Sequence, residues 1–128
     1  MKKDIESRKD IEVLVNRFYD RVKTDPVIGY IFTDLVKVNW EDHLPKMYEF
    51  WENALFYTGS YTGNPLRIHM HLHHMFPLTS QHFLRWNQLF NETVDLLFSG
   101  ERARLAKQRA KSISSVMQLR ILNEGNLL

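Results

Sequence analysis

The sequence predicts an all-α protein, and three observations support this. Apolar residues recur at spacings of three and four in four long segments, which is the period of an amphipathic helix. The strict alternation of a half-buried strand is not evident, and residues typical of loops separate the helical segments. A chain of 128 residues suffices for one hydrophobic core, so we expect a single domain over residues 1–128.

The composition is that of a soluble globular protein. Hydrophobic residues make up 44% and charged residues 25% of the chain. The chain has no cysteine, which excludes disulfides and thiolate metal sites and is compatible with a reducing cytoplasm. No apolar run approaches the roughly 18 residues of a membrane span, and residues 1–10 are too charged for a secretory signal. We expect a cytoplasmic protein without a membrane partner.

The basic residues do not indicate a nucleic-acid partner. The net charge is only +2, and the late basic residues would spread around a helix without interleaved aromatic residues for base stacking. We therefore expect a solvated helix surface at these positions, which are Arg102, Arg104, Lys107, Arg109 and Lys111.

The first helix is expected to open at Asp4 or Ser7. Its apolar stripe consists of Ile11, Leu14, Val15, Phe18 and Val22. Tyr19 should point inward, so its hydroxyl requires a partner. After the break at residues 25–29, residues 27–35 are expected to form a short helical or turn segment that carries Phe32.

The second helix is expected over residues 40–57. Its apolar stripe contains Trp40, His43, Leu44, Met47, Phe50, Trp51 and Leu55. Pro45 conflicts with a straight helix, so the helix should begin near Asp42 or bend at the proline. His43 is the one polar member of the stripe, and it is either a core histidine bonded to a carbonyl or a residue beside a bound ligand.

Two more helices complete the prediction. Residues 58–65 form a loop by composition, and Thr79 or Ser80 should cap a third helix over residues 81–98. A fourth helix is expected over residues 101–122, with Gly125 beyond its end. Its apolar markers are Leu105, Ile113, Val116, Met117 and Ile121.

Residues 65–76 hold four of the six histidines, at positions 69, 71, 73 and 74. Neutral imidazole binds transition metals and haem iron, so the cluster suggests a metal or cofactor site. In a short helix His69 would share an apolar face with Leu66, Met70 and His73. A zinc site would also need a carboxylate or cysteine, and no acidic residue lies between Asn53 and Asn91. The alternative is that His71, His73, His74 and His82 are solvated loop histidines.

The residues alone leave two possibilities for the interior. The chain has 8 phenylalanines, 5 tyrosines and 3 tryptophans, which is a large amount of flat apolar surface. Four helices with such an interior could be a plain bundle. They could also enclose a planar cofactor held between facing helices.

The residues resemble a known family, the truncated haemoglobins of the third group. The resemblance covers nearly the whole chain and lies in several short motifs in a fixed order. They are Phe18-Tyr19, Trp40 followed by His43 and Phe50-Trp51, Asn64-Pro65-Leu66 before His69, and Phe83-Leu84-Arg85-Trp86 with Leu89-Phe90. The chain also lacks the glycine pairs that other truncated globins carry.

The resemblance implies a two-over-two helical sandwich around haem b. It implies that His69 is the proximal ligand of the haem iron, although His71, His73 and His74 remain chemical alternatives. The remaining residues that the resemblance implies are Tyr19, His43, Met47 and Trp86 on the distal side, Phe32 against the haem face, and Lys46 near a propionate.

The resemblance also implies a function. We expect binding of O₂ and of other diatomic ligands such as CO, NO and cyanide, with high affinity and slow release. A peroxidase-like activity or NO detoxification is an alternative and would require a reductase. A non-haem metal-binding protein and a cofactor-free interaction module are further alternatives. We expect a monomer or a weak dimer.

Overall fold

The computed structural model describes residues 2–31, 40–57 and 79–126. In these ranges the chain forms four long α-helices and no strand: α1 (Arg8–Thr24), α2 (Trp40–Phe56), α4 (Ser80–Leu97) and α5 (Glu101–Asn126). Residues 29–31 are helical as well, within the segment 27–35 that was predicted to be helical or a turn. The all-α prediction is confirmed, and each of the four long helices lies where the periodicity predicts it.

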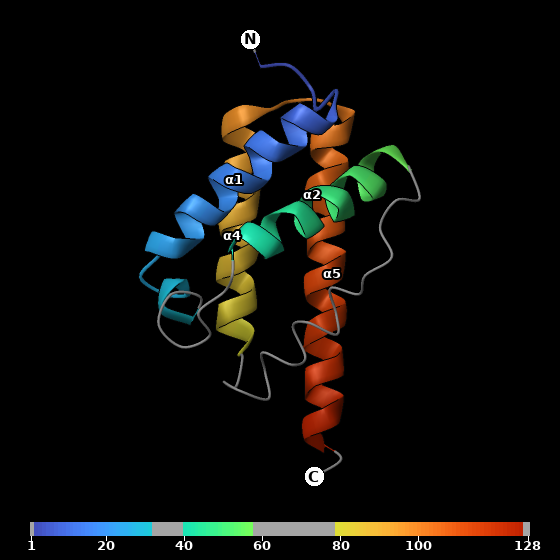
Figure 1. The fold of residues 1–128 in the computed structure, drawn as a ribbon. Coiled ribbons are helices and arrows are strands. Elements are labelled where there is room, and N and C mark those ends of the chain that lie inside the picture. Colours follow the sequence, from blue (N-terminus) through green and yellow to red (C-terminus); the bar gives the residue numbers. More distant parts are fainter. Residues whose placement is uncertain (1, 32–39, 58–78, 127–128) are drawn as a thin grey trace.

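The helices are arranged as two pairs that cross each other. Figure 1 shows α1 and α2 lying across α4 and α5. Contacts join α1 to α2, α4 to α5, α1 to α4 and α2 to α5, so each helix of one pair packs on the other pair. This is the expected two-over-two sandwich.

The first helix opens at Ser7, which has the extended backbone of an N-cap residue. All five predicted apolar positions of α1 are buried, and so is Tyr19. At the other end, Asp25 terminates α1 by donating its backbone N–H to the carbonyl of Val22. Gly29 lies so close behind this last turn that a Cβ on it would be 2.8 Å from the carbonyl oxygens of Val22 and Lys23.

The second helix covers Trp40–Phe56, close to the predicted range 40–57, and it runs through Pro45 instead of beginning at Asp42. Proline lacks an N–H and cannot donate to the carbonyl four residues earlier, at Glu41. The buried positions Met47, Trp51 and Leu55 confirm the predicted face of α2.

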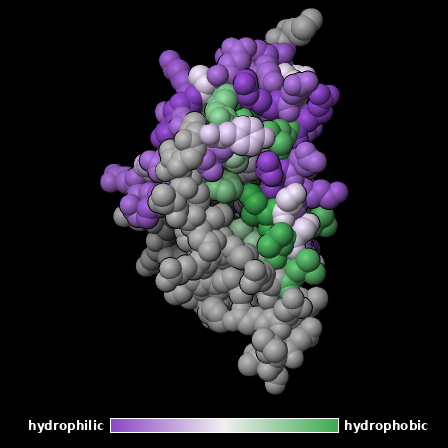
Figure 2. Space-filling view, turned by 90° about the vertical axis from the view of Figure 1, so that its right-hand side faces the viewer, coloured by the Kyte–Doolittle hydropathy of each residue, from purple (hydrophilic) through white to green (hydrophobic). Residues whose placement is uncertain are grey.

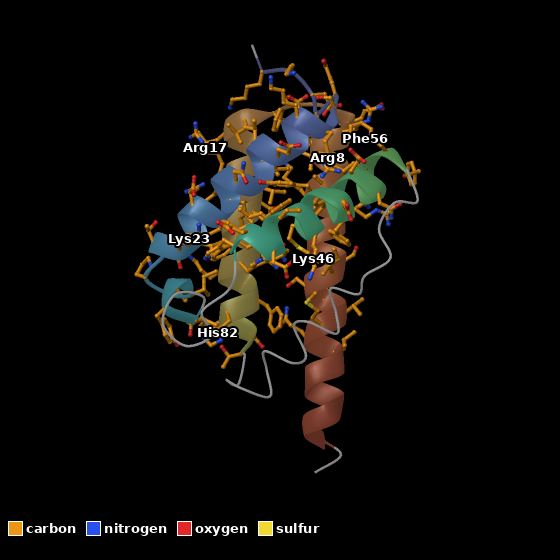
Figure 3. The ribbon with its side chains drawn as sticks, viewed as in Figure 1. Arg8, Arg17, Lys23, Lys46, Phe56 and His82 are labelled. Carbon is orange, nitrogen blue, oxygen red and sulfur yellow. The ribbon has the colours of Figure 1, made fainter. Side chains whose placement is uncertain are left out.

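Thr79 caps α4, as predicted, but its partner was not expected. The Thr79 hydroxyl accepts a bond from the backbone N–H of His82, and His82 Nδ1 accepts one from the Thr79 N–H at 3.0 Å. His82 therefore lies in the first turn of a helix (Figure 3), so the prediction of a loop histidine is wrong for this residue. Burial lowers the pKa of His82, which favours the neutral ring that accepts this bond.

The last helix is longer than predicted. It continues to Asn126, so the placement of Gly125 beyond its end is wrong. A glycine inside a helix costs only about 1 kcal/mol relative to alanine, which does not by itself end a helix. Val116 was expected on the buried stripe and is 48% exposed, whereas Met117 beside it is buried. Arg102, Arg104, Arg109 and Lys111 are exposed, as expected, and Lys107 is half-buried.

The N-terminal arm, residues 2–7, fixes the corner between α4 and α5. The carboxylate of Asp4 accepts bonds from the backbone N–H groups of Arg102, at 3.0 Å, and Ala103, at 2.9 Å. Asp4 thus caps the last helix rather than opening the first. Gly100 has φ +143°, and a Cβ on it would lie 2.5 Å from the Asp4 Cγ, so the corner requires glycine.

Aromatic rings form the centre of the core. Phe90 stacks on Trp51 with ring centroids 4.8 Å apart and on Trp86 at 5.8 Å. Phe18 meets both Phe90 and Trp86 edge-on. Figure 2 shows one outer face, which is hydrophilic toward the end with the N-terminal arm and carries hydrophobic side chains lower down.

Candidate functional site

A tyrosine and a histidine are paired where α1 crosses α2. His43 Nε2 lies 3.2 Å from the Tyr19 hydroxyl oxygen, within hydrogen-bonding distance. Tyr19 is 6% exposed and belongs to the hydrophobic core, whereas His43 is half-buried. The sequence predicted that the Tyr19 hydroxyl needs a partner, and His43 supplies one.

Aromatic rings surround this pair on the described side. The Tyr19 ring lies 5.0 Å from Phe18 and 5.1 Å from Trp40, measured between centroids. Trp40 also meets His43 edge-on at 5.8 Å. The ammonium of Lys23 lies over the Trp40 ring, 4.3 Å from its centroid, which is a cation–π contact at the rim of the cluster.

Burial controls the protonation of the tyrosine. Removing a phenolate from water is unfavourable, so burial raises the pKa of Tyr19 well above its ordinary value. A tyrosine hydroxyl keeps its proton at physiological pH even at its ordinary pKa of about 10, and burial favours this donor form further.

Two further predicted site residues lie in the same core. Met47 is one turn after His43 on α2 and is 5% exposed. Trp86 is half-buried on α4, with its ring edge-on to Phe18 at 5.5 Å. Because Phe18 contacts both Tyr19 and Trp86, one ring connects the α1 and α4 parts of the site.

Lys46 lies outside this buried cluster. It is on the exposed surface of α2 (Figure 3), and its ammonium forms an ion pair with Asp42 one turn earlier, at 3.1 Å. Its side chain is 57% exposed, so it can exchange this partner for another anion at little cost. The contact of Lys46 with a propionate remains a prediction.

The other half of the predicted site lies outside the described residues. This holds for His69, the predicted iron ligand, for its alternatives His71, His73 and His74, and for Phe32. Among the described residues, no three His, Cys, Asp or Glu side chains are grouped to hold a metal ion.

The site contains residues that sequence reasoning did not assign to it. Trp40 was expected on the same apolar stripe as His43 and in the motif of the resemblance, but it was given no role at the site, where its ring meets His43. The ion pair between Asp25 and Arg85 was not predicted at all. No pattern of neighbouring residues predicts this ion pair, because its two members are 60 residues apart in the sequence.

The chemistry of these side chains fits a small ligand at the distal face of haem. The Tyr19 hydroxyl, the His43 ring and the Trp86 indole all supply N–H or O–H donors next to an apolar wall. The hydrogen bonds within the described chain leave the Trp86 indole N–H without an acceptor. Such a donor set suits a ligand that carries partial negative charge, and aromatic walls suit a flat macrocycle.

Comparison with known proteins agrees with this fold. The family model described as "Bacterial-like globin" matches residues 3–121. The chain belongs to the bacterial-like globins, and it is therefore a haem-binding globin.

One relative indicates to which group of globins this chain belongs. Group 3 truncated hemoglobin ctb from Campylobacter jejuni is 30% identical over 98% of both chains. The crystal structure of the group III truncated hemoglobin from Campylobacter jejuni matches with a TM-score of 0.80, covering 94% of this chain and 95% of the other at 30% identity. The recognition as a group III truncated haemoglobin is thereby confirmed.

No helix in the described ranges has the length and apolar character needed to cross a membrane.

Proposed function

We propose that this globin binds O₂ and other diatomic ligands at haem b with high affinity and slow release. Tyr19, His43 and Trp86 would be the donors on the distal side, and His69 the proximal ligand. When bound, haem would supply an iron that takes up a diatomic gas. The observation that carries the proposal is the buried Tyr19–His43 pair.

The pair can donate and accept in sequence. His43 Nε2, when protonated, donates to the Tyr19 oxygen, which frees the Tyr19 O–H to donate to a ligand. This proton is present at physiological pH at the ordinary pKa of tyrosine, and burial raises the pKa of Tyr19 further. The arrangement fixes the direction of the hydroxyl before a ligand arrives, so little reorganisation is needed on binding.

The size of the effect follows from the number of donors. A hydrogen bond contributes about 0.5–1.5 kcal/mol net, and more when the acceptor is charged. Two donors, Tyr19 and Trp86, would slow O₂ dissociation by roughly one to three orders of magnitude, because about 1.4 kcal/mol is a factor of ten. Slow release suits scavenging, sensing or redox chemistry better than delivery.

The test is the O₂ dissociation rate of the Tyr19→Phe variant. It should rise by about tenfold or more, because the ring is kept and only the donor is lost. Tyr48→Phe is the matched control, since the Tyr48 hydroxyl also joins α2 to α1, through Asn16, away from the described site. An unchanged rate in Tyr19→Phe would remove Tyr19 from ligand stabilisation.

The proximal residue has its own test. His69→Ala should lose the haem or its axial signature in the visible spectrum, while His73→Ala should keep both. If the two variants exchange these outcomes, the iron ligand is His73.

A haem-dependent redox activity is the second candidate. His43 Nε2 next to the Tyr19 hydroxyl could hold a proton during cleavage of a peroxide O–O bond, or the site could convert NO, together with O₂ as the source of both added oxygen atoms, to nitrate. Both need an electron donor. Peroxide turnover with a dye reductant should then fall in His43→Leu, and equal turnover in both proteins would exclude His43 as the proton-holding group.

A further inference from the structure

The most deeply buried ion pair among the described residues lies beside the candidate site. Arg85 Nη2 and Nε lie 2.6 and 2.9 Å from Asp25 Oδ1. The side chain of Asp25 is 2% exposed and that of Arg85 is 30% exposed. Oδ2 of Asp25 accepts the backbone N–H groups of Val27, at 3.0 Å, and Ile28, at 3.1 Å.

This geometry leaves the carboxylate little freedom. Both of its oxygens are engaged, one by a planar guanidinium and the other by two backbone groups. The same residue ends α1, through its own N–H, and accepts the N–H of Gly29 on its carbonyl. Asp25 is thus part of the backbone turn after α1, so Arg85 is attached to that turn and not to a mobile side chain.

The pair joins the two helices that carry the proposed donors. Asp25 follows the last turn of α1, the helix of Tyr19, and Arg85 immediately precedes Trp86 on α4. Trp86 in turn lies against Phe18, the ring that also contacts Tyr19. A shift or rotation of the first turns of α4 would therefore move the Trp86 indole relative to Phe18.

A buried ion pair is a poor source of stability, because the cost of removing two charges from water offsets much of their attraction. A geometric role explains its presence better. A guanidinium that meets one carboxylate from two nitrogens fixes direction as well as distance.

We propose that Asp25 and Arg85 are positioning residues, whose ion pair sets the rotation of α4 and thereby aims the Trp86 indole N–H at the ligand position beside Tyr19. The inference rests on the proposed function, because the aim of the indole matters only if a ligand binds there. It adds two residues that do not touch the ligand.

The chain offers a matched control. Arg21 on α1 forms an ion pair with Glu92 on α4 at 3.0 Å, so it joins the same two helices. Its side chain is 36% exposed and that of Glu92 is 52% exposed. Arg21→Gln therefore removes an α1–α4 ion pair without removing the buried one.

The experiment measures O₂ dissociation in Asp25→Asn, Arg85→Gln, Arg85→Lys and Arg21→Gln. The first two should release O₂ about tenfold faster, which corresponds to the loss of about one well-aimed hydrogen bond. The O₂ dissociation rate of Arg85→Lys should lie between the rates of these two variants and that of the original protein. An ammonium keeps the positive charge but lacks the planar pair of nitrogens that meets the carboxylate. Arg21→Gln should stay within about twofold.

A second readout does not depend on release rates. In the CO-bound protein, the indole N–H resonance of Trp86, assigned with Trp86→Phe, should shift in Asp25→Asn. The resonance of Trp51, which stacks on Phe90, should not. In the Trp86→Phe background, Asp25→Asn should change the O₂ dissociation rate by less than about twofold, because coupled residues are not additive.

The outcomes separate this inference from the proposed function. If Tyr19→Phe and Trp86→Phe accelerate release but Asp25→Asn and Arg85→Gln do not, the positioning role is wrong and the proposed function stands. If neither Tyr19→Phe nor Trp86→Phe accelerates release, the proposed function fails first. An equal acceleration by Asp25→Asn with and without Trp86 would show a general loosening of the fold and would also overturn the inference.

Discussion

Two regions of this globin hold a polar side chain in hydrogen bonds, and they do so in different ways. At the corner of α4 and α5, the carboxylate of Asp4 accepts backbone N–H groups from Ile5, Arg102 and Ala103. Where α1 crosses α2, the Tyr19 hydroxyl meets the His43 ring, and both partners are side chains. The backbone N–H groups have the carboxylate as their partner, whereas a tyrosine oxygen that accepts from an imidazole keeps its own O–H available for a further partner.

This difference indicates what each region is for. A carboxylate that accepts backbone N–H groups contributes to the free energy of unfolding, since removing it leaves those N–H groups without this partner. A side-chain pair next to aromatic rings keeps its donors available. Substitutions at the corner should therefore change stability and not ligand release, and substitutions at the pair should mainly change ligand release.

The largest expected effect is that of Gly100→Ala. The backbone at φ +143° disfavours a side chain, and the new Cβ would collide with Asp4, so we expect a loss of about 3 kcal/mol. Urea unfolding followed by circular dichroism measures this loss. Ser99→Ala is the control, because Ser99 is exposed and bonds to Lys3 through its backbone N–H. The O₂ dissociation rate should not change. A faster rate would contradict the assignment of this corner to stability alone.

Asp4→Asn should cost about 1 kcal/mol at pH 7, because it removes the charge from a helix cap. Burial alone would raise the pKa of Asp4, but the N–H groups of Arg102, Ile5 and Ala103 outweigh burial and lower it below 3.8. The stabilisation is therefore present above the unfolded-state pKa and is lost as the pH falls through the folded-state pKa.

Urea unfolding at pH 7 and at pH 3 checks this dependence on pH. The difference between Asp4→Asn and the original protein should shrink at the lower pH. Glu6→Gln is the control, because the Glu6 side chain on the same arm is 62% exposed. A difference that stays constant would mean that the amide, and not the charge, carries the effect.

An effect of the same size as that of Asp4→Asn, but on ligand release, is expected for His43→Leu. Loss of the bond that orients the Tyr19 hydroxyl should accelerate O₂ release by about fivefold, which corresponds to about 1 kcal/mol. Stopped-flow displacement of O₂ by CO measures the rate. The unfolding free energy should change less than in Gly100→Ala. A larger loss of stability than of ligand retention would make the pair a structural feature like the corner.

Much of the fold was predictable because its signals are local. The spacing of Ile11, Leu14 and Phe18 defines the buried face of α1, and Thr79 starts α4 as predicted. The errors are local as well. Val116 is exposed although it is apolar, and Gly125 lies inside α5. The period of apolar residues along one helix does not show how far the other helices extend beside it, so it does not decide which of its residues are covered.

The candidate site was predictable only in part. Tyr19 and His43 were each identified, and the resemblance to the third group of truncated haemoglobins assigned both to one pocket. Their direct contact, the Trp40 ring beside them and the ion pair of Asp25 with Arg85 appear only in the structure. The role of His69 remains a prediction.

The sequence by itself determined the helices, their buried faces and the family, because periodicity, caps and short motifs are written in neighbouring residues. Only the tertiary structure decided that Asp4 caps α5 instead of opening α1, and that Arg85 reaches Asp25. The physical reason is that these partners are 99 and 60 residues apart. A charged side chain pairs with the group that helix packing places next to it. Because the packing depends on the whole chain, such a pair cannot be predicted from neighbouring residues.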